Sequence, residues 1–75
     1  MIARVVIWSL FDSKTTLDEL QAHLPLLQEG SYWISNAVSD RFGLVWVGDD
    51  PPDLGFLPEL IGTEPVVAEE FDVIE

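Results

Sequence analysis

The chain has 75 residues, no cysteine and a formal charge of −11, from 14 acidic and three basic side chains. This length predicts one domain over residues 1–75 with a small hydrophobic core, and the lack of cysteine excludes a disulfide framework or a thiolate zinc site. The charge argues against nucleic acid as a partner, because phosphate binding needs Lys and Arg.

The N-terminal stretch from Ile2 to Leu10 predicts a strand that is apolar on both faces, with Arg4 as its only charge. A strand of this kind belongs at the centre of a sheet. The stretch is too short and too interrupted for a signal peptide, and no run approaches the about 20 apolar residues of a membrane span. We therefore expect a soluble, cytoplasmic protein without a membrane partner.

The first helix is expected to begin near Thr16, which with Glu19 forms a capping-box pattern. The amphipathic stripe that follows consists of Leu17, Leu20, Leu24 and Leu27. Pro25 limits the helix, because proline in a helix interior removes a hydrogen bond and clashes with the preceding turn.

A hairpin is predicted in the middle of the chain. Tyr32 to Val38 indicates a strand of mixed polarity, suited to a sheet edge, and Phe42 to Gly48 indicates a strand that is apolar on both faces and therefore central. Ser39, Asp40 and Arg41 form the expected turn between them.

The last third of the chain is acidic and carries no basic residue after Arg41. Asp49 to Asp53 contains two prolines and predicts a loop, and Leu54 to Ile61 predicts a short or broken helix that ends at Gly62. Val66 to Ile74 predicts an exposed edge strand. The nine acids after Arg41 favour a solvated surface, and the alternative is a surface for a basic partner or a nucleic-acid mimic.

The predicted order of elements is β-α-β-β-α-β, the arrangement of ferredoxin-like α+β domains with a four-stranded antiparallel sheet. In that arrangement the first and third strands are central and the second and fourth lie at the edges. The two strands that are apolar on both faces are the first and the third. The pattern of hydrophobicity thus agrees with the predicted topology.

Two helices can cover only one face of such a sheet, so one alternating set of side chains is left uncovered. The preferred assignment turns Val5, Ile7, Val45 and Val47 toward the helices. It leaves a mainly apolar set uncovered, namely Arg4, Val6, Trp8, Leu10, Trp33, Leu44 and Trp46. The combined surface of three tryptophans is larger than the apolar patch that a monomer usually exposes. We therefore expect a homodimer that packs sheet against sheet, or with a cleft for a flat hydrophobic ligand. The opposite assignment makes the tryptophans ordinary core.

The hairpin and the C-terminus resemble a known family. The matching residues of the hairpin are Tyr32-Trp33, Asn36 and Phe42-Gly43, and those of the C-terminus are Leu60-Ile61-Gly62, Pro65 and Phe71-Asp72-Val73. Together they cover about half the chain and are similar to dimeric α+β-barrel proteins of the cofactor-independent monooxygenase type. The resemblance implies subunits that pair through their sheets. It also implies that Trp33 and Asn36 line a cavity, in which some members oxidise polycyclic aromatic substrates with protein side chains alone.

The candidate ligand-binding residues are those expected around an apolar cavity: Arg4, Trp8, Trp33, Asn36 and Trp46. Three of them also have a structural interpretation: Trp33 as an interface anchor, Asn36 as a residue bonded to the backbone of its own turn, and Arg4 in a salt bridge across the interface. No residue is identified as catalytic.

His23 is the candidate for acid–base work, with a capping or surface role as the favoured alternative. No cofactor or metal is implied, since Asp49, Asp50 and Asp53 lack the spacing of a calcium loop. The expected function is the binding or cofactor-free oxidation of a flat hydrophobic molecule. The alternative is a non-catalytic acidic module that inhibits or regulates a basic partner.

Overall fold

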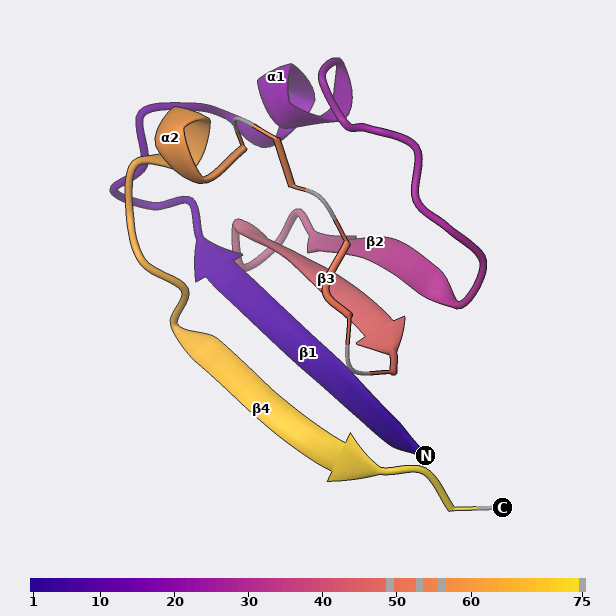
Figure 1. Ribbon diagram of the computed structural model, residues 1–75. Helices are drawn as coiled ribbons and strands as arrows, with labels where there is room; N and C mark the ends of the chain where they lie inside the picture. Colours follow the sequence, from indigo (N-terminus) through magenta and orange to yellow (C-terminus); the bar gives the residue numbers. More distant parts are fainter. Residues whose placement is uncertain (49, 53, 56, 75) are drawn as a thin grey trace.

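A four-stranded antiparallel sheet with two short helices forms the fold in a computed structural model that describes residues 1–48, 50–52, 54–55 and 57–74 (Figure 1). The elements are β1 (Ile2–Ser9), α1 (Leu17–Gln21), β2 (Ser31–Asn36), β3 (Arg41–Val47), α2 (Leu57–Ile61) and β4 (Val67–Asp72). The strand order is β2-β3-β1-β4. The small α+β fold and the central positions of the first and third strands are therefore confirmed.

The strand register determines which side chains share a face. On β1 and β3, Arg4 pairs with Trp46, Val6 with Leu44 and Trp8 with Phe42. The alternate positions on these strands include the pairs Val5 with Val45 and Ile7 with Gly43. Because side chains alternate along a strand, the first set and the second set lie on opposite faces of the sheet.

The N-terminus of α1 has half of the expected capping box. Thr16 accepts a hydrogen bond from the backbone nitrogen of Glu19 at 3.3 Å, which satisfies one free donor of the first turn. The Glu19 carboxylate accepts instead from the Thr15 hydroxyl at 2.9 Å. The helix ends at Gln21, so His23 and Leu24 lie beyond it.

The helix α2 is short, as the sequence predicts. Pro58 is tolerated because it occupies the first turn, where a missing backbone donor costs little. Gly62 follows with φ +77° and donates to the Pro58 carbonyl at 2.9 Å, which closes the helix in the left-handed conformation that favours glycine.

The hydrophobic core lies between the helices and the face of the sheet that carries the tryptophans. Its buried residues are Trp8, Leu10, Leu20, Phe42, Leu57 and Ile61, with Trp33, Val6 and Leu24 among those packed against it. Trp8 is 4% exposed and Trp46 is 7% exposed. The preferred assignment of the faces is therefore wrong, and the alternative is confirmed.

The physical reason for this outcome is the length of the helices. Each has five residues, and the two contribute only Leu20, Leu57 and Ile61 to the buried set. So little helical material leaves space above the sheet, and close packing requires that the sheet fill it with its largest side chains. Trp8 and Phe42 do this, whereas the smaller Val5 and Val45 face away.

Candidate functional site

The three tryptophans occupy structural positions. The rings of Trp8 and Trp33 both stack on Phe42, with centroids 6.3 Å and 5.3 Å away. The Trp33 indole donates to the Pro25 carbonyl at 3.1 Å, so it ties β2 to the segment after α1. The Trp46 indole nitrogen is buried and has no acceptor among the described residues. Trp8 and Trp33 therefore form an aromatic cluster with Phe42, and Trp46 is buried on the same face of the sheet.

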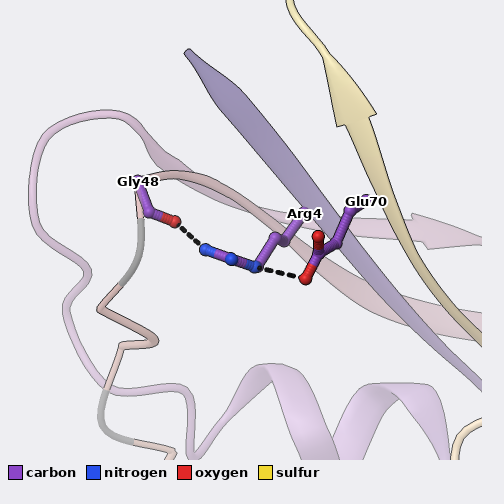
Figure 2. A network of polar contacts seen from close by, with 3 residues as sticks. All are labelled: Arg4, Gly48 and Glu70. Carbon is purple, nitrogen blue, oxygen red and sulfur yellow. Dashed lines mark hydrogen bonds and ion pairs between the residues drawn. The ribbon is translucent and has the colours of Figure 1, made fainter.

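Arg4 lies in a polar network near the end of the sheet where β1 begins and β3 ends (Figure 2). Its Nε donates to Glu70 at 3.2 Å, and its guanidinium also donates to the Gly48 carbonyl. The Arg4 side chain is 21% exposed and that of Glu70 is 63% exposed. Arg4 thus joins β1 to β4 and to the end of β3 within one chain, which gives it a structural role rather than one in a ligand cavity.

Asn36 fixes the turn of the β2–β3 hairpin. Its side-chain oxygen accepts from the backbone nitrogens of Val38 and Ser39, at 3.0 Å and 3.2 Å. Asp40 has φ +54°, and its carbonyl accepts from the Leu10 backbone nitrogen at 2.8 Å. The structural interpretation of Asn36 is therefore confirmed. The turn spans residues 37–40, so Arg41 belongs to β3 and not to the expected turn.

The remaining candidates are dispersed. His23 is exposed in the turn after α1. In the part of the chain that the structure describes, no three His, Asp or Glu side chains are placed to hold a metal ion. Asp49 and Asp53, two of the three carboxylates of the acidic loop, lie outside the described residues.

The face that the helices leave uncovered is mostly apolar. We call it the uncovered face. It consists of the strand residues Ala3, Val5, Ile7, Ser9, Tyr32, Ile34, Asn36, Arg41, Gly43, Val45, Val47, Val67, Glu69 and Phe71. None of these residues belongs to the core beneath the helices. Tyr32 is 65% exposed and Phe71 is 49% exposed, which leaves large apolar surfaces in water.

A half-open hollow of about 190 Å³ lies at one end of the uncovered face. It is lined by Ile7, Ile34, Ser35, Asn36, Ser39, Arg41, Phe42 and Gly43. Gly43 pairs with Ile7 on one side and Ile34 on the other, and its backbone forms part of the wall of the hollow. Arg41 stands at the polar end of the hollow.

Sequence reasoning missed Arg41 and the residues around Gly43 as members of a site. Arg41 was expected in a turn, and Gly43 was interpreted only as part of an apolar strand. A glycine between two strongly apolar strand positions was the available signal, because it marks a close approach or a gap in a sheet.

Among the described residues, no helix is long and apolar enough to cross a membrane. No protein-family model matches the chain, and no curated protein is significantly similar to it in sequence.

Proposed function

We propose that the protein is a ferredoxin-like binding domain that forms a homodimer, with the uncovered faces of two copies packed against each other. Two such sheets face to face make a dimeric α+β barrel, which is also what the resemblance of the hairpin implies. The strand order β2-β3-β1-β4 supports the proposal, as does the position of the core on one side of the sheet.

The observation that carries the proposal is the apolar character of the uncovered face. Of its four cross-strand rows, the three other than the row of Asn36, Arg41 and Ser9 are apolar or aromatic at every strand position except Gly43 and Glu69. With strands about 4.8 Å apart and about 3.3 Å of rise per residue, this area measures about 19 by 20 Å, or about 400 Å². The largest apolar patch on a typical monomer is of this size and is often functional. It is small for a specific interface, so we expect a dimer that dissociates at low concentration.

Sedimentation velocity over a concentration series tests this proposal. The 8.4 kDa chain is expected to shift toward a species of twice that mass as concentration rises. A double variant, Ile7→Thr with Val45→Thr, keeps β-branched side chains and should shift the equilibrium toward monomer. Val38→Thr, at an exposed position in the hairpin turn, is the matched control. A wild-type chain that stays monomeric at submillimolar concentration contradicts the proposal.

The hollow beside Gly43 favours a second candidate function, the binding of a small flat hydrophobic molecule. A cavity of about 150 Å³ is enough to hold benzene, and the hollow has about 190 Å³. We propose binding rather than oxidation, because Trp8 and Trp46, two of the residues expected around a substrate cavity, are buried. Titration with benzyl alcohol should move the Gly43 and Ile34 amide signals in NMR spectra. Shifts confined to other residues contradict this candidate.

A further inference from the structure

The uncovered face carries one cation and one anion among its described strand residues, Arg41 on β3 and Glu69 on β4. Both residues are exposed, and neither side chain has an ion-pair partner within the described part of the chain. In a sheet-to-sheet dimer these charges would lose water, and an unpaired buried charge is costly. Each charge therefore needs a partner of opposite sign.

Arg41 and Glu69 of the same copy cannot form an ion pair with each other. Arg41 pairs with Ser9 on β1, whereas Glu69 pairs with Val5 on the other side of β1. They are two strands and four residues apart, which is roughly 16 Å in a sheet of ordinary dimensions. An ion pair requires contact at about 4 Å, so the partner must come from another molecule.

In the strand register, Ile7 lies midway between Arg41 and Glu69. Ile7 lies midway between Ser9 and Val5 on β1, and β1 lies between β3 and β4. The midpoint between Arg41 and Glu69 on the sheet is thus the position of Ile7. A two-fold axis in the interface plane, through Ile7 and perpendicular to the line between the charges, exchanges the two positions.

We infer that two copies of the chain pair about this axis, with Arg41 of each copy on Glu69 of the other. The inference rests on the proposed homodimer and specifies its symmetry and its ion pairs. A closed two-fold interface is self-complementary, so one contact of this kind always generates the second. The axis makes the strands of the two sheets cross at roughly 70°, near the orthogonal class of sheet packing. Val5 of one copy then lies near Gly43 of the other, which places an apolar side chain beside the hollow.

Charge reversal separates this pairing from a general effect of net charge. Glu69→Arg changes the formal charge from −11 to −9, since it removes one negative and adds one positive charge. Lower net charge alone should tighten a dimer of two acidic chains. The pairing predicts the opposite, because Arg41 then meets a second arginine. Asp72→Arg makes the same charge change on β4, on the opposite face, and is the matched control.

Sedimentation equilibrium of five chains, the wild type, the three single variants and the double variant, decides the outcome. Arg41→Glu and Glu69→Arg should each raise the dimer Kd about tenfold, as expected for loss of a close interfacial charge pair. The double variant with both reversals should return to within about threefold of the wild type, because the two changes are coupled. If Glu69→Arg tightens the dimer as Asp72→Arg does, or the double variant stays weak, the pairing is wrong although the dimer stands. A monomeric wild type would overturn both the proposed function and this inference.

Discussion

Gly43 lies so close to β1 that its missing side chain is a structural requirement. A Cβ built on Gly43 would lie 2.5 Å from the Val6 carbonyl oxygen and 3.1 Å from Cγ1 of Ile7. The closer neighbour is backbone in a central strand, which cannot move without disturbing the ladder between β1 and β3. The same glycine lines the hollow on the uncovered face, so one residue contributes to both the strand spacing and the hollow.

Gly43→Ala should therefore destabilise the fold, although alanine has the higher strand propensity. Overpacking of this kind typically costs about 1–3 kcal/mol. Urea denaturation followed by tryptophan fluorescence measures the loss in free energy of unfolding. Ser35→Ala, at an exposed strand position, is the control and should change stability by less than about 0.5 kcal/mol. Equal stability of Gly43→Ala and the wild type would mean that β1 and β3 are farther apart than described.

Phe42→Leu should lower stability more than its small loss of volume implies. Phe42 stacks on both Trp8 and Trp33, and each aromatic pair contributes about 0.5–1.5 kcal/mol beyond area burial. We expect a total loss of about 1–3 kcal/mol in the free energy of unfolding, with reduced near-ultraviolet circular dichroism from the tryptophans. Leu44→Met, a volume-conserving change at a buried position without these stacks, is the control. An unchanged near-ultraviolet spectrum in Phe42→Leu would contradict the stacking.

The strand pattern was predictable because β1 and β3 are apolar at nearly every position, and only central strands bear that composition. The face assignment was not predictable by the same reasoning, because alternation alone cannot distinguish two apolar faces. Side-chain size carried the missing information. Trp8, Phe42 and Trp46 are large and share one face, whereas Val5 and Val45 are small and share the other, and only the large set can fill the space above two five-residue helices.

The site was harder to predict than the fold for a similar reason. Arg4 drew attention as a lone charge in an apolar strand, yet it is bound to Glu70 and the Gly48 carbonyl in its own chain. The sequence does not mark Arg41 as a candidate, because a charged residue next to Ser39 and Asp40 is typical of a turn. Its place on the sheet depends on the Asn36 hydrogen bonds, which confine the turn to residues 37–40.

Substitution of Arg4 should lower the stability of the fold more than substitution of its partner Glu70. Glu70 is mostly exposed, and surface ion pairs contribute about 0–1 kcal/mol, so Glu70→Gln should have little effect on stability. Arg4→Gln also replaces the guanidinium that donates to the Gly48 carbonyl with a shorter side chain and should cost about 1–2 kcal/mol. Thermal unfolding of both variants measures the difference. If Glu70→Gln is as damaging as Arg4→Gln, the ion pair and not the carbonyl contact dominates.

Thr16→Ala should weaken α1 by about 0.5–2 kcal/mol, because it removes the side chain that caps the helix. Thr16→Ser keeps the hydroxyl and should retain most of that stability. Amide hydrogen exchange at Glu19 and Leu20 reports the local effect. Slow exchange at these amides in Thr16→Ala would show that the cap contributes nothing to the helix.

Isotope-filtered NOE spectroscopy on a mixture of ¹³C,¹⁵N-labelled and unlabelled chains tests the central claim most directly, because it detects contacts only between copies. We predict intermolecular NOEs from the methyl groups of Ile7, Val5 and Val45, residues that lie on the uncovered face. The Leu20 and Leu57 methyl groups of the core should show none. The measurement is made at a concentration where sedimentation detects association. If Ile7 and Val45 then show no intermolecular NOEs, the proposed dimer is contradicted.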